Sequence, residues 1–148
     1  MVRPDGTVAV MFWSSQQLLP GHPDLEARLN RTQAGLAPAL MEWPATRHPL
    51  RAFGWMQTAG LKERKAATFV AEIRSPLDET GKEALAAIIQ MRWGRPMSEL
   101  TDTEWAEFER LLDRRGPDSI VDAEDYYGFF TYSLFWGKVP AKAPPADP

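Results

Sequence analysis

The chain contains no cysteine, and its only histidines are His22 and His48. The lack of cysteine excludes disulfide bonds, thiolate nucleophiles and thiolate metal ligands. With two histidines and no thiolate, a zinc site built from histidine and cysteine is excluded as well. The acidic run of Asp122, Glu124 and Asp125 has the oxygen ligands of a hard-cation site, but it is better explained as a helix start, where the helix dipole favours negative charge. We therefore expect no metal and no cofactor.

Long apolar runs are also lacking. The run from Val8 to Trp13 spans six residues, whereas a membrane-spanning helix needs about 20. No small-residue cleavage site follows it, so it does not resemble a signal peptide. Gly54, Gly60 and Gly94 are isolated and do not form a phosphate-binding or dinucleotide-binding loop. These absences predict a soluble, cytoplasmic protein with no membrane partner.

The composition that remains is ordinary for a globular protein. Of its 148 residues, 44% are hydrophobic and 25% are charged, which suits one domain with a sizeable core. Residues 139–148 contain four prolines, and such a segment does not form a packed element. We predict one domain over residues 1–138, followed by an extended, Pro-rich tail over residues 139–148.

Two segments have the composition of β-strands. Residues 7–13 are rich in β-branched and aromatic residues, and both alternating faces are apolar, which predicts a central strand covered on both sides. Residues 67–73 have one apolar face and one wetter face that carries Glu72, which predicts a second strand. The stretch from Glu42 to Gly60 is interpreted mostly as loop, with a short strand at Leu50–Gln57.

Three segments predict helices. One starts near Pro23 and ends before Pro38, because its apolar residues keep a period of 3.6. Thr80 followed by Glu83, and Thr101 followed by Glu104, have the spacing of capping boxes and predict two further helices. Together these elements predict an α+β fold, in which a sheet of two to four strands packs against three or four helices in a single domain.

The aromatic residues are concentrated near the C-terminus. Seven of the sixteen lie within eleven positions, namely Tyr126, Tyr127, Phe129, Phe130, Tyr132, Phe135 and Trp136. Ala123, Tyr127, Phe130 and Leu134 keep helical spacing, whereas Phe, Tyr, Trp and Thr favour strands and Gly128 weakens a helix by about 1 kcal/mol. We predict a helix here and keep a strand as the alternative.

These rings exceed what a domain of this size is expected to bury. Bulky, stiff side chains with a polar atom are typical of protein interfaces. The sequence therefore predicts a non-catalytic protein-interaction module of the assembly, adaptor or inhibitor type, whose partner is another protein or a second copy of itself. The predicted partner-binding residues are Tyr126, Tyr132, Phe135 and Trp136.

The alternative function is contact with nucleic acid. Residues 45–65 hold five basic residues and one acidic residue, a balance of +4, and aromatic residues are interleaved with them. This pattern suits base stacking with phosphates held nearby. An isoelectric point of about 5.4 argues against a dedicated nucleic-acid binder. The candidate residues are Arg47, Arg51, Phe53, Trp55, Lys62, Arg64 and Lys65.

The third function class is a small enzyme without a cofactor. Ser14 with His48 as base, or Glu72 as an acid or base, are the candidates for catalysis. No G-x-S-x-G motif supports the serine, and Glu72 is more simply explained as a strand residue paired with a basic neighbour. An enzyme is therefore less favoured than a binding protein.

Overall fold

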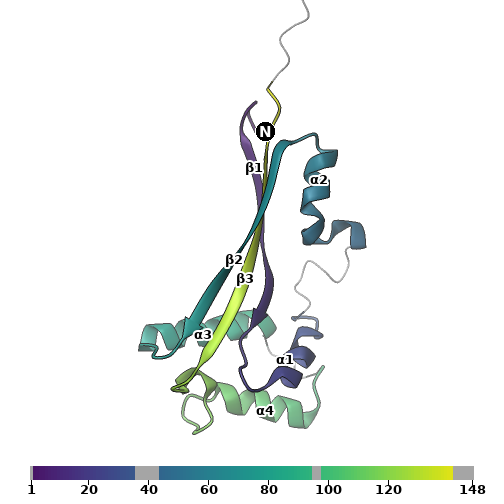
Figure 1. Cartoon of the computed structure of the whole chain (residues 1–148). Coiled ribbons are helices and arrows are strands. Elements are labelled where there is room, and N and C mark those ends of the chain that lie inside the picture. The colour runs from purple at the N-terminus through teal and green to yellow at the C-terminus, as the bar shows by residue number, and fades with distance from the viewer. Residues whose placement is uncertain (1, 36–43, 95–97, 142–148) are drawn as a thin grey trace, which may run out of the picture. The chain divides into compact units, whose positions relative to one another are not determined.

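The structure is a computed structural model that describes residues 2–35, 44–94 and 98–141. This part of the chain forms a three-stranded antiparallel sheet and four α-helices (Figure 1), which confirms the predicted α+β fold. The strands are β1 (Thr7–Gln17), β2 (Lys62–Arg74) and β3 (Tyr127–Lys138). The α-helices are α1 (Pro23–Asn30), α2 (Ala52–Thr58), α3 (Glu79–Trp93) and α4 (Asp102–Leu112).

Contacts between Cα atoms divide the described chain into two compact units. Unit 1 holds residues 2–15, 44–70 and 131–141, and unit 2 holds residues 16–35, 71–94 and 98–130. Each strand contributes residues to both units. The boundaries at 1–138 and 139–148 stay predictions, and residues 142–148 of the predicted tail lie outside the described residues. Val139 is described, and its N–H donates to the carbonyl of Gly6.

The aromatic segment is strand β3, so the predicted helix is wrong. The residue types favour an extended backbone, and its two glycines lie where there is little room for a side chain. A Cβ on Gly128 would lie 2.6 Å from the hydroxyl of Tyr126, and a Cβ on Gly137 would lie 3.2 Å from the carbonyl oxygen of Lys62. Neighbouring chain therefore approaches this strand closely, and the high strand propensity of Phe, Tyr, Trp and Thr completes the preference.

Strand β3 is also the central strand, because the order in the sheet is β1-β3-β2. The prediction that residues 7–13 form the central strand is wrong, and so is the expectation that both faces are covered, since Met11 is 63% exposed. A central strand carries backbone partners on both sides and tolerates charge poorly. Strand β3 has no charged residue before Lys138, whereas β2 begins with four charged residues.

The register of the sheet in unit 1 follows from four contacts. The N–H of Asp5 donates to the carbonyl of Val139, whose own N–H donates to Gly6. The rings of Trp13 and Tyr132 lie 6.0 Å apart, and the hydroxyls of Thr68 and Ser133 are 3.1 Å apart. Because side chains alternate along a strand, these contacts assign each residue to one of the two faces of the sheet.

Helix α2 covers part of one face in unit 1. Its buried residues Ala52 and Met56 form a core with Leu61 and Phe135. Partly buried apolar residues of β1 pack against this core, and the ring of Phe12 stacks on Phe135 with centroids 6.0 Å apart. The short strand predicted at Leu50–Gln57 is therefore wrong. His48 accepts the N–H of Leu50 and starts a helical turn that leads into α2.

Unit 2 has a core of its own, built by α1, α3 and α4. Trp93 of α3 meets Phe108 of α4 edge to face, with ring centroids 6.4 Å apart. Helix α4 begins with the predicted capping box of Thr101 and Glu104. Helix α3 is capped by Asp78 and not by Thr80, so its predicted capping box is wrong.

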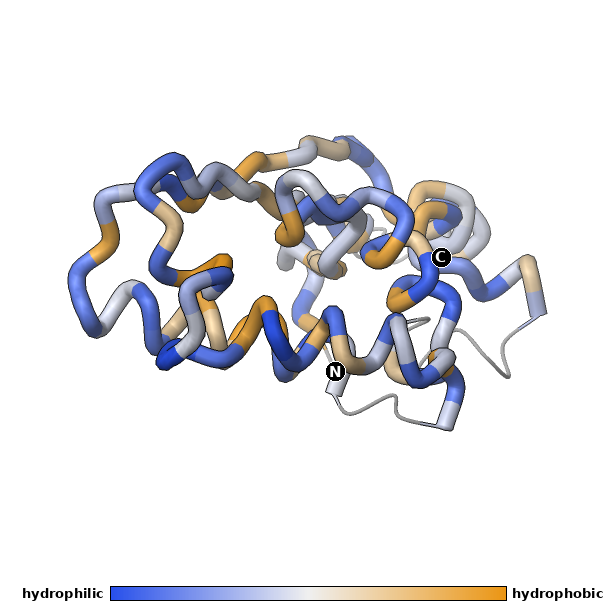
Figure 2. Tube along the Cα trace, turned by 90° about the horizontal axis from the view of Figure 1, so that it is seen from below, coloured by the Kyte–Doolittle hydropathy of each residue, from blue (hydrophilic) through white to orange (hydrophobic). Residues whose placement is uncertain are grey.

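Hydrophobic residues are distributed along the chain in short stretches between hydrophilic ones (Figure 2). Among the residues that the structure describes, no helix combines the length and the apolar composition that crossing a bilayer requires.

Candidate protein-interaction surface

One face of the sheet in unit 1 carries two exposed apolar side chains, Met11 and Phe69, beside several half-buried ones. The ring contact of Trp13 with Tyr132 places both on this face. Phe69 belongs to it as well, because its neighbour Thr68 contacts Ser133 on the opposite face. We name this the open sheet face, and its members are Met11, Trp13, Phe69, Tyr132, Leu134 and Trp136.

Two members of the open sheet face are strongly exposed. Met11 has 63% of its surface exposed and Phe69 has 55%. Tyr132, Leu134 and Trp136 are half-buried. Exposed apolar residues that are scattered singly are normal, but residues gathered on one face of a sheet form a continuous patch.

Charged residues lie at one end of the open sheet face. The alternation along β2 and β3 places Lys65 and Lys138 on this face, and an ion pair places Glu63 beside Lys138. Lys138 and Glu63 form an ion pair with 3.1 Å between Nζ and Oε2. An apolar centre with charge at its rim is the anatomy of a protein interface.

The four predicted partner-binding residues divide into two pairs. Tyr126 is 2% exposed and Phe135 is 8% exposed, so their rings belong to the cores of unit 2 and unit 1 and not to an open surface. The hydroxyl of Tyr126 donates to the carbonyl of Leu18 at 3.0 Å, and burial raises the pKa of this hydroxyl. Tyr132 and Trp136 lie on the open sheet face, and their role in binding stays a prediction.

Sequence reasoning missed Met11 and Phe69. The signal was present, because both sit on strands in which apolar residues recur on both faces. With only one face of such a strand covered by a helix, the other apolar face remains exposed.

The basic segment is only partly available at the surface. Arg47, Arg51 and Phe53 are exposed, as are Lys62 and Lys65. The guanidinium of Arg64 lies over the ring of Phe53, 5.9 Å from its centroid.

Trp55 differs from the rest of the basic segment. It packs against the core of unit 1, and its Nε1 donates to the carbonyl of Thr46 at 2.8 Å. Phe53 is the more exposed of the two aromatic residues, and the role of both in base stacking stays a prediction.

The serine candidate for catalysis lies in a row of hydroxyl groups. Ser14 Oγ is 2.8 Å from Thr131 Oγ1 and 2.9 Å from Ser133 Oγ, and Ser133 continues to Thr68. His48 instead accepts the N–H of Leu50 through Nδ1. In the described chain Ser14 contacts Thr131 and Ser133, and its pairing with His48 as a base stays a prediction. Glu72 is exposed on β2.

Unit 2 contains a buried carboxylate that the sequence did not indicate. Glu26 Oε1 and Oε2 both accept the N–H of Leu18, at 3.0 and 3.1 Å, and Oε2 accepts the N–H of Leu19. Burial raises the pKa of this carboxyl, although the two backbone donors oppose the shift. Glu26 lines a cavity of about 670 Å³ together with Gln16 and Asn30.

A raised carboxyl pKa in a cavity is typical of a catalytic acid, but the surrounding bonds favour a structural role. Both carboxylate oxygens of Glu26 already accept hydrogen bonds from backbone N–H groups. Asn30 Oδ1 accepts from Gln16 at 2.6 Å and from Trp93 at 3.0 Å. These groups fix the turn after β1 onto α1 and α3.

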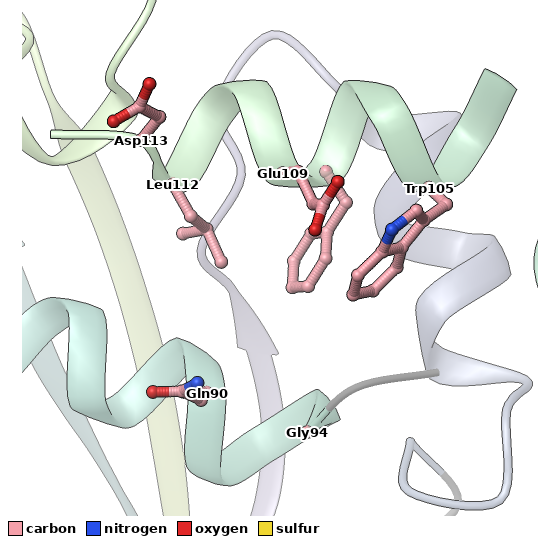
Figure 3. A pocket seen from close by; sticks show the side chains of 7 residues that line it. Gln90, Gly94, Trp105, Glu109, Leu112 and Asp113 are labelled. Carbon is pink, nitrogen blue, oxygen red and sulfur yellow. The ribbon is translucent and has the colours of Figure 1, made fainter. Parts of the chain in front are cut away.

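A second hollow of about 450 Å³ lies between α3 and α4. Figure 3 shows Trp105 and Leu112 projecting from α4 toward α3, while Asp113 points away. Gln90 and Gly94 line the α3 side. The polar side chains that line the hollow are Gln90, Glu109 and Asp113.

The acidic run near residue 122 is engaged in ion pairs. Asp122 contacts Lys82 at 2.8 Å and Arg114 at 3.7 Å, and these cations lower the pKa of its carboxyl, together with Ser119. In the described ranges, no group of three or more metal-ligating side chains gathers.

No protein-family model matches this chain, and no relative is found among curated proteins.

Proposed function

We propose that this protein is a non-catalytic protein-interaction module that binds another protein through the open sheet face. The observation that carries the proposal is the exposure of Met11 and Phe69 on the same face as the half-buried Leu134 and Trp136. Removing such side chains from water stabilises a complex by roughly 25 cal/mol per Å² of apolar surface.

The geometry of the face suits a protein partner better than a small molecule. A small-molecule site is concave and encloses most of its ligand, whereas this surface is one side of a sheet. Aromatic residues and Met are enriched in the cores of protein interfaces. The charged rim of Glu63, Lys65 and Lys138 supplies the polar border that such interfaces have.

The test captures partners from the native host with the full chain as bait. Met11→Ser combined with Phe69→Ser removes the apolar side chains that are exposed and therefore contribute little to the fold. Met91→Ser is the matched control, because Met91 is 70% exposed but lies on α3. A partner identified by mass spectrometry is then purified and its affinity measured for each variant.

The expected result is a Kd raised at least about tenfold by the double variant, equal to about 1.4 kcal/mol, and unchanged by Met91→Ser. The midpoint of thermal unfolding should be the same for all three proteins. Equal affinity of the double variant and the original chain would sink the proposal.

A second candidate function is contact with single-stranded nucleic acid. It is favoured by the exposed Phe53 with Arg64 over its ring and by the exposed Arg47 and Arg51 nearby in sequence. Binding should weaken steeply with salt and be lost in Arg51→Ala combined with Phe53→Ala. Absence of binding to single-stranded DNA and RNA at low salt removes this candidate.

A further inference from the structure

The two edge strands of the sheet differ in how they are protected. Strand β1 has no charged residue, no proline and no glycine from Thr7 to Gln17. Strand β2 carries six charged residues, Lys62, Glu63, Arg64, Lys65, Glu72 and Arg74. Glu63 also has a positive φ of 48°, which interrupts the extended backbone near the start of β2. Charge and backbone irregularity are the devices by which natural sheets prevent pairing at their edges, and β1 has neither.

In the described chain β1 is an edge strand, and its outward backbone groups follow a known pattern. Gly6 accepts the N–H of Val139 and therefore faces β3. In an antiparallel ladder the next residue faces the other way, so the N–H and C=O groups of Thr7, Ala9 and Met11 point away from β3. By the same alternation along β2, the N–H and C=O groups of Ala66 point away from β3.

We propose that β1 pairs in antiparallel orientation with β1 of a second copy of this chain. The two three-stranded sheets then join into one sheet of six strands. The bonds are formed by backbone groups at Thr7, Ala9 and Met11 and by their counterparts in the second copy.

Symmetry and charge both favour a second copy as the occupant. Pairing of β1 with β1 is two-fold symmetric and closes at two chains, whereas pairing of β1 with β2 continues without end. The closed dimer uses both unprotected edges and leaves only the charged β2 edges outside. Because β1 is uncharged, two copies of it bring no like charges together.

The pairing has a consequence for the open sheet face. Outward backbone groups belong to odd-numbered residues of β1, so Ala9 or Met11 of one copy is opposite an odd-numbered residue of the other. Residues that are directly opposite share a face. The open sheet faces of the two copies therefore form one continuous surface. The inference does not rest on the proposed function, because it uses the backbone edge and not the side chains of that face.

The test measures the mass of the full chain in solution by sedimentation over a range of concentrations. Ala9→Pro removes an outward N–H from β1, and Ala66→Pro makes the same change on β2. Both alanines are exposed, and proline is tolerated at such edge positions. The circular dichroism spectrum checks that each variant is folded.

The unaltered chain and Ala66→Pro should be dimers, and Ala9→Pro should raise the dimer Kd by roughly 100-fold. A monomer at every concentration overturns the proposal for the unaltered chain. A dimer that persists in Ala9→Pro shows that another surface, such as the open sheet face, joins the copies, and this also overturns it.

A second measurement keeps the proposal testable if Ala9→Pro fails to fold. Hydrogen exchange of the unaltered chain should slow at the amides of Ala9 and Met11 as the concentration rises through the dimer Kd. The expected slowing is about tenfold or more, with no change at Ala66. Exchange at Ala9 that is independent of concentration overturns the pairing.

Discussion

The two units differ in how fully helices cover their aromatic side chains. In unit 2, Trp93, Phe108 and Tyr126 are buried, and the polar atoms of Trp93 and Tyr126 donate to Asn30 and Leu18. In unit 1, Phe69 is mostly exposed and Trp136 is half-buried. The number of aromatic residues in a segment therefore does not indicate which of them are buried in a core.

The difference lies in how much helix each unit supplies. Unit 2 contains α1, α3 and α4, which have 8, 15 and 11 residues. In the part of unit 1 that is described, α2 is the one α-helix and has seven residues. A sheet with apolar side chains on both faces needs cover on both faces. In the part of the chain that is described, this short helix covers part of one face, and no α-helix of unit 1 covers the other.

The largest effect is expected for Trp93→Ala in unit 2. The ring is fully buried and meets Phe108, so its loss leaves a cavity and should lower the free energy of unfolding by about 3–5 kcal/mol. Urea denaturation measures it. Trp136→Ala on the open sheet face is the control and should cost roughly half as much or less. Equal losses would remove the contrast between the two units.

An intermediate effect that depends on pH is expected from Glu26. Burial raises the pKa of its carboxyl above the ordinary value of 4.5, so the folded chain holds the proton at a pH at which the unfolded chain has released it. Stability from this group is complete below pH 4.5 and is lost as pH rises through the raised pKa.

The measurement compares the unfolding free energies of Glu26→Gln and the unaltered chain between pH 4 and 7. The unaltered chain should lose stability relative to the variant as pH rises, while other carboxyls cancel in the difference. A difference that stays constant with pH, or changes in the opposite direction, would contradict the role assigned to burial.

The smallest effect is expected for Phe69→Ser. With 55% of the side chain already in water, the free energy of unfolding should change by no more than about 0.5 kcal/mol, measured by thermal or urea denaturation. Phe12→Ser, on the face packed by α2, is the matched control and should destabilise the chain strongly. A loss above about 2 kcal/mol for Phe69→Ser would mean that the open sheet face is core.

Much of the fold could be predicted from local signals. The capping box at Thr101 and Glu104 and the proline at position 23 each mark a helix start through contacts within one turn. Strands at residues 7–13 and 67–73 follow from composition, although β1 and β2 extend beyond those limits. The fold class follows from the order of these elements.

Features that depend on distant partners could not be predicted in the same way. The aromatic segment contains both a helical spacing and a strand composition. What decides between them is pairing with β1 and β2, which lie far away in the sequence. The order of the strands is likewise non-local, so β3 was not recognised as the central strand.

The candidate site shows the same limit. Tyr126 and Tyr132 have equal side chains six positions apart, yet one is sealed in a core and the other lies on the open sheet face. The exposure of each tyrosine depends on which elements pack over it. The residues next to it in the sequence do not indicate which elements these are.

The row of hydroxyls across the sheet has a consequence for how the strands find their alignment. A shift of the strand register by one residue would turn apolar side chains to the wrong face. A shift by two residues would keep each side chain on its face, so burial alone does not disfavour it. Ser14, Thr131, Ser133 and Thr68 contact one another only in one alignment. A two-residue slip of β1 would put Phe12 or Gln16 in the place of Ser14 and leave half-buried hydroxyls without their partners. The contacts among these four small side chains therefore fix the register of the strands, which the packing of the larger rings does not fix.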